Sequence, residues 1–163
     1  HRGKLKLGKK DDRIIFLEKL QKLTNDVKYD LYGVNNVQPI WADHYFKTIS
    51  NAKMGLNLSR GEAIKYYSSD RITQIVGNGL VCLIDEKTKY KDFFTNDEMV
   101  FYKNLDDLSE KINKISRDDK LRRKIARKGK EKYMKYFNST KVAEFIIEKA
   151  LDIKTNKKYF WHN

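Results

Sequence analysis

The order of apolar segments along the chain constrains its fold more than any other feature of the sequence. Between Arg13 and Tyr102, segments whose apolar residues recur at helical spacing alternate with short apolar runs of strand length. A helix that joins two strands of one sheet forms a right-handed crossover, and successive crossovers place the strands parallel to one another. The sequence therefore predicts an α/β domain in which helices cover both faces of a parallel sheet.

The elements of this domain follow from the apolar spacing and from turn residues. Strands are expected at 27–32, 53–58, 80–84 and 99–102, helices at 14–23, 43–51 and 71–78, and one helical turn at 90–94. Asp11 or Asp12 can cap the first helix. Ser69 and Asp70 can cap the third helix, which Gly79 ends.

From residue 105 onward only helical spacing occurs. The sequence thus predicts a Rossmann-like parallel sheet followed by a C-terminal helical segment. The domain is expected to span residues 1–151, with a tail at 152–163. A doubly wound domain normally opens with a buried strand, whereas this chain opens with a basic polar loop and a helix. We therefore expect the chain to be cut from a longer protein.

Length and composition narrow the class of protein. A chain of 163 residues, 40% hydrophobic and 35% charged, suits one folded domain. It contains no run of ~20 apolar residues and no secretory signal pattern. The single cysteine, Cys82, lies inside an apolar run and is interpreted as a small buried hydrophobic residue. A cytoplasmic location is expected.

The chain is strongly basic, with a net charge of +13. Such a charge suits nucleic acid, an anionic membrane or a phosphorylated ligand. The richness in Lys, Asn, Ile and Tyr has a second explanation, which is codon bias in an AT-rich genome. The charge alone does not choose between these alternatives.

The segment from Ser68 to Asp85 carries the strongest functional signal. In doubly wound sheets the ligand binds at the carboxyl ends of the strands, so the loops at 33–41, 59–71 and 85–91 are the ones to examine. A polar turn, Ser68-Ser69-Asp70-Arg71, opens a short helix whose first amides and positive dipole end can hold a phosphate. Arg71 can add a bidentate contact to a diphosphate.

This segment resembles the donor-binding motif of GT-B glycosyltransferases, in which a loop and a helix N-terminus hold the diphosphate of a nucleotide sugar. In that family an acidic residue five positions before a glycine usually binds the ribose hydroxyls. Gln74 occupies this place, five residues before Gly79. A glutamine accepts and donates hydrogen bonds, but it lacks the charge that strengthens them.

A longer series of motifs is similar to a GT-B branch related to the spore-maturation glycosyltransferases. The series runs through Gly55-Leu56-Asn57-Leu58-Ser59, Ser69-Asp70-Arg71, Asp85, Asn104-Leu105-Asp106-Asp107-Leu108 and Leu121-Arg122-Arg123-Lys124-Ile125-Ala126. It covers roughly residues 53–151. The resemblance implies the C-terminal, donor-binding lobe of a GT-B fold, and a fucosyltransferase-like alternative leaves the sugar open.

The same resemblance assigns further residues. It places cationic residues of the N-terminal loop near the diphosphate, with Arg2, Lys4 and Lys9 as candidates, and Glu62 near the transferred sugar. A solvated loop carboxylate is the alternative for Glu62. Trp41 or Tyr32 is a candidate stacking surface for the base, although core packing is the interpretation we favour for Trp41.

The resemblance also implies what the chain needs from elsewhere. The catalytic base of inverting members comes from the N-terminal lobe, so no catalytic residue is assigned in this chain, and an isolated fragment is expected to be inactive. Neither a metal nor a separate cofactor is expected, because a nucleoside-diphosphate sugar is itself the substrate.

A basic run from Lys111 to Lys135 adds a question about partners. A solvated helix face is the favoured interpretation, an anionic membrane or lipid-linked acceptor the next, and nucleic acid the last. The expected function is donor binding in sugar transfer for glycan biosynthesis. The alternatives are a non-catalytic nucleotide- or partner-binding module and a basic nucleic-acid-binding protein.

Overall fold

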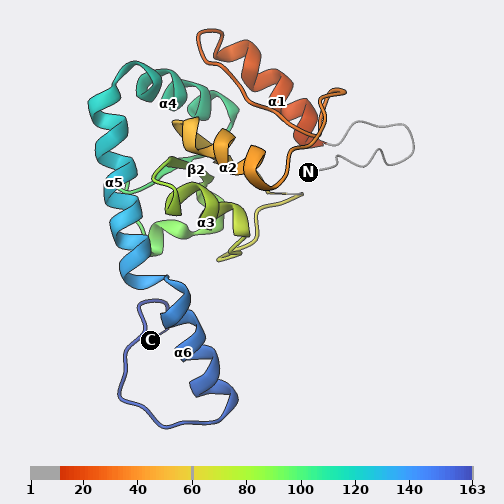
Figure 1. Ribbon diagram of the computed structural model, residues 1–163. Helices are drawn as coiled ribbons and strands as arrows, with labels where there is room; N and C mark the ends of the chain where they lie inside the picture. Colours follow the sequence, from red (N-terminus) through yellow and green to blue (C-terminus); the bar gives the residue numbers. More distant parts are fainter. Residues whose placement is uncertain (1–11, 60, 163) are drawn as a thin grey trace.

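The computed structural model of the chain describes residues 12–59 and 61–162 (Figure 1). Three strands form a parallel sheet in the order β1-β2-β3. The elements, in chain order, are α1 (Asp12–Leu23), α2 (Ala42–Asn51), β1 (Met54–Asn57), α3 (Asp70–Gly77), β2 (Val81–Asp85), η1 (Glu86–Thr88), η2 (Tyr90–Asp92), β3 (Val100–Tyr102), α4 (Leu105–Arg117), α5 (Asp119–Tyr136) and α6 (Ser139–Ala150). The predicted fold class, a Rossmann-like α/β lobe with a C-terminal helical segment, is confirmed.

The two faces of the sheet bury separate hydrophobic cores, because successive side chains of a strand point to opposite faces. Cys82 and Ile84 of β2 lie in the core that includes Ile72, Ile75 and Val76 of α3. Val81 and Leu83 of β2 lie in the core that α1 and α4 cover. Helix α5 contributes side chains to both cores, and in Figure 1 it runs along the left side of the sheet and its helices.

Helix α3 ends where the sequence predicts. Gly79 has a φ of +76°, a left-handed conformation that glycine adopts without strain, and its amide donates to the carbonyl of Val76. The chain then turns directly into β2. The turn brings the N-terminus of α3 and the carboxyl ends of β1 and β2 to one edge of the sheet, as a parallel crossover requires.

One predicted strand is absent from the described part of the chain. Residues 27–32 begin with a bend, have no regular secondary structure and pair with no strand there. Val27 and Tyr29 pack on the core beneath α1 and α4, and the Tyr29 hydroxyl lies 2.6 Å from that of Thr24. The alternating pattern therefore reflects two side chains that reach the core, and the strand prediction was wrong.

The C-terminal residues fold back against the helical segment. Aromatic rings of residues 159–162 contact rings of α5 and α6, including Tyr136–Phe160 at 4.6 Å and Phe145–Tyr159 at 5.0 Å between centroids. Figure 1 shows α6 and this segment at one end of the molecule. None of the described helices is long and apolar enough to cross a membrane.

Candidate functional site

A cluster of polar side chains joins the end of β1 to the start of α3. The Ser69 hydroxyl donates to Asn57 Oδ1 at 3.0 Å. Arg71 Nη1 donates to the Leu58 carbonyl at 2.7 Å and to Asn57 Oδ1 at 3.3 Å. Two of the predicted site residues, Ser69 and Arg71, therefore meet at the carboxyl edge of the sheet.

Asn57 organises this cluster and was not among the predicted site residues. It is the last residue of β1 and is only 4% exposed. Its side-chain oxygen accepts from both Ser69 and Arg71, so a buried amide fixes the position of the helix start. The Asn-Leu-Ser motif contained the signal, but its partners lie 12 and 14 residues further along the chain.

The side chain of the N-cap residue does not cap the N-terminus of α3, although the Ser69 carbonyl accepts from the Ile72 amide at 2.9 Å. Ser69 occupies the N-cap position with extended backbone angles, but its side chain makes no capping hydrogen bond. It is turned to Asn57 instead. The first amides of an α-helix have no acceptor within the helix, and the helix dipole makes this end positive. The start of α3 therefore presents donors and positive potential at the edge of the sheet.

The guanidinium of Arg71 lies half-buried beside this helix start. Burial lowers the pKa of the Arg71 guanidinium, and the positive charge of Arg13, in the first turn of α1, lowers it further. Within the described residues Arg71 forms no ion pair. A half-buried guanidinium without an ion pair favours an anion beside it. Arg13 was not predicted as a site residue.

Tyrosines lie near Arg71 and in the loop before α3. Tyr45 of α2 and Tyr67 of the loop before α3 are close enough to affect the pKa of Arg71. Tyr66 of the same loop has a φ of +59°, and its hydroxyl donates to Asp92 Oδ2 at 2.5 Å. The pKa of Tyr66 is raised, and the hydrogen bond to Asp92 is the largest cause. This hydrogen bond ties the loop to η2.

The remaining predicted residues are placed as follows. Ser68 is exposed, and its side chain hydrogen bonds to Tyr90. Asp70 is exposed in the first turn of α3, where a carboxylate suits the helix dipole. Gln74 is partly exposed one turn along α3, and Glu62 is exposed in the preceding loop. The structure does not bring Glu62 into contact with the Asn57 cluster.

Some predictions fall elsewhere. Arg2, Lys4, Lys9 and the Asp11 cap lie outside the described residues. Trp41 is 70% exposed just before α2, so the favoured core-packing interpretation was wrong. The interpretation of Cys82 is confirmed, because it lies in the core and burial raises the pKa of its thiol to about 12.

A parallel sheet flanked by helices, with a helix N-terminus at its carboxyl edge, defines the class of Rossmann-like α/β lobes. A family model described as glycosyl transferase-like matches residues 13–148. The chain belongs to that glycosyltransferase-like family. No curated protein and no solved structure gives a significant match.

Proposed function

We propose that this chain is the donor-binding, C-terminal lobe of a GT-B glycosyltransferase and holds a nucleoside-diphosphate sugar for transfer to an acceptor. The observation that supports this most is the half-buried Arg71, which forms no ion pair within the described residues and is held at the start of α3 by Asn57 and Leu58. A diphosphate carries negative charge that the Arg71 guanidinium and a helix N-terminus would neutralise. The family match supports glycosyl transfer in general.

Each residue of the cluster has a distinct role in this proposal. The first amides of α3 hydrogen bond to the diphosphate, while Arg71 supplies its counter-charge. Asn57 and Ser69 hold the helix start in place and do not touch the ligand. Gln74, one turn further along α3, hydrogen bonds to the ribose hydroxyls as both donor and acceptor.

The proposal assigns donor binding to this chain and the catalytic base to the other lobe of the GT-B fold. Such a division predicts that the chain by itself binds donor but does not transfer the sugar. The candidates Arg2 and Lys4 lie outside the described residues, and Glu62 would need to move toward the sugar, because it is exposed in the loop.

The test is titration of the chain with UDP and GDP. Arg71→Ala removes charge-assisted hydrogen bonds to the diphosphate, so binding should weaken by about 1 to 3 kcal/mol. Arg127→Ala is the matched control, since Arg127 is exposed on α5 and pairs with Glu131 at 3.1 Å. Equal titration curves for Arg71→Ala and the control would refute the role given to Arg71.

A non-catalytic nucleotide-binding module is the second candidate, and Gln74 is the residue that favours it. An uncharged side chain at the ribose position makes weaker hydrogen bonds than a carboxylate. Gln74→Glu should therefore tighten UDP or GDP binding if this surface descends from a donor site. Unchanged or weaker binding would favour a module that recognises a different ligand.

A further inference from the structure

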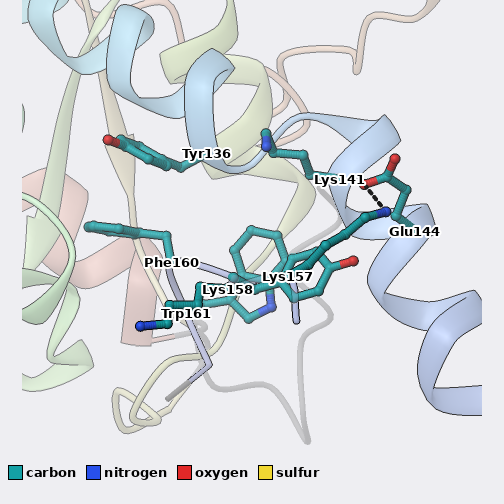
Figure 2. A pocket seen from close by; sticks show the side chains of 8 residues that line it. Tyr136, Lys141, Glu144, Lys157, Lys158, Phe160 and Trp161 are labelled. Atoms are coloured by element: carbon teal, nitrogen blue, oxygen red, sulfur yellow. Dashed lines mark ion pairs between the residues drawn. The ribbon is translucent and has the colours of Figure 1, made fainter. Parts of the chain in front are cut away.

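A cavity that the proposed donor site does not use lies between α5, α6 and the C-terminal residues. Its volume is about 540 Å³, within the range of small-molecule sites. Aromatic side chains and lysines line most of it, and Figure 2 shows these side chains from close by. The cavity is therefore formed by the segment that folds back after α6.

Aromatic rings hold one wall of the cavity in place. Phe160 stacks on Tyr136 with 4.6 Å between ring centroids, and Trp161 stacks on Phe137 at 5.4 Å. Phe160 is nevertheless 40% exposed. The stacking fixes the rings, and the exposure leaves apolar ring surface for a ligand.

The charged wall contains two lysines without a partner. Lys157 is neutralised, because its Nζ lies 3.1 Å from Glu148 and 3.6 Å from Glu144, the second pair being drawn in Figure 2. By contrast, Lys141 and Lys158 form no ion pair within the described residues. The lining thus offers two uncompensated ammonium groups beside one carboxylate.

We propose that this cavity binds an anionic carbohydrate, meaning a sugar ring that bears a carboxylate or a phosphate. The apolar C–H face of a pyranose packs on the open surfaces of Phe160 and Trp161. Glu144 accepts hydrogen bonds from ring hydroxyls, and Lys141 and Lys158 pair with the anionic group.

Other ligand classes fit the lining less well. An aliphatic ligand would cover the two ammonium groups and Glu144 without satisfying them, which costs free energy. A bare inorganic anion would leave the aromatic wall without a contact. A neutral sugar would leave the two lysines unpaired. An anionic sugar contacts the aromatic wall, pairs with the two lysines and hydrogen bonds to Glu144.

Ring contacts connect the cavity to the loop that precedes α3. Phe93 lies 6.3 Å from Phe160 and 5.0 Å from Tyr66, between ring centroids. The binding proposal stands without any sugar transfer. If the proposed function also holds, these contacts make an anionic sugar the class of acceptor expected near the donor.

Binding can be followed by the fluorescence of Trp161. The chain has two tryptophans, so Trp41→Phe leaves Trp161 as the single reporter. Tetragalacturonate supplies carboxylates and glucose 6-phosphate supplies a phosphate, with maltotetraose and inorganic phosphate as controls. A saturable change with at least one charged sugar, and not with the controls, is expected. The stronger of the two charged sugars identifies the anion.

A double variant, Lys141→Gln with Lys158→Gln, tests the charged wall. Binding of the charged sugar should weaken by about tenfold or more, since both charged contacts are lost. Lys114→Gln with Lys120→Gln is the matched control, because both lysines are exposed on other helix surfaces. Thermal melting of each variant separates loss of binding from loss of folding.

The two sites should respond independently. UDP binding should be unchanged in the Lys141→Gln, Lys158→Gln variant, and charged-sugar binding should be unchanged in Arg71→Ala. The inference is overturned if neither charged sugar alters the fluorescence, if a control ligand binds equally well, or if the double variant binds like its control.

Discussion

At the scale of single residues, the hydrogen bonds of Arg71 to Asn57 and to the Leu58 carbonyl hold the start of α3 at the carboxyl edge of the sheet. Arg71 was predicted as a site residue from its place at a helix start. Asn57 was not predicted, because its importance depends on a hydrogen bond to a residue 14 positions further along the chain. A single sequence shows the motif around Asn57 but not what its side chain touches.

Asn57 gives a prediction about the proposed donor site. Asn57→Ala removes the acceptor for Ser69 and Arg71 from a buried position, so unfolding free energy should fall by about 1 to 3 kcal/mol. Asn57→Asp keeps the acceptor but places a negative charge beside Arg71, and it should weaken UDP binding more than it weakens folding. Urea denaturation and UDP titration of both variants measure the two effects. Retained UDP affinity in Asn57→Asp would contradict the anion site.

At the scale of elements, apolar periodicity predicted most helices and strands within a few residues. It failed for residues 27–32, where alternation arises from two side chains that reach the core and no strand within residues 12–59 or 61–162 pairs with them. It also predicted α6 without showing what covers it, and Ile146 and Ile147 of that helix are 58% and 53% exposed. Periodicity shows that one face of a helix is apolar, but which element packs against that face depends on tertiary structure.

Contact between α5 and the loop before β3 gives a prediction at this scale. A Cβ added to Gly129 would clash with the Glu98 carbonyl oxygen, a backbone atom that cannot easily move. Gly129→Ala should therefore lower the unfolding free energy by about 2 kcal/mol or more. Gly77→Ala is the control, because its Cβ would meet only Met134 Cε at an ordinary 3.7 Å. The control should be neutral or stabilising by up to about 1 kcal/mol, as urea denaturation can show. Equal stabilities of the two variants would mean that α5 does not approach the loop this closely.

At the scale of the whole molecule, ion pairs within the chain neutralise part of its positive charge. The chain has a net charge of +13, yet many cations of α5 are already paired with carboxylates. These pairs join Arg122 and Arg123 to Asp119, Arg127 to Glu131, Lys128 to Asp97 and Lys132 to Glu98. Carboxylates of the chain therefore neutralise much of the positive charge of α5, the helix whose basic sequence suggested nucleic-acid binding. By contrast, Arg71 at the start of α3 and Lys141 and Lys158 of the C-terminal cavity form no ion pair within the described part of the chain.

This distribution predicts a contrast between two ligands under increasing salt. Exposed, paired cations give weak oligonucleotide binding that disappears between ~50 and ~200 mM salt, because such binding depends on counterion release. UDP at a half-buried arginine and a helix N-terminus is less screened, so its affinity should fall much less over the same range. Titrations of one preparation with a generic oligonucleotide and with UDP make the comparison directly. Tight oligonucleotide binding at ~200 mM salt would shift the function toward nucleic acid, since the paired face of α5 would then have to open to phosphates.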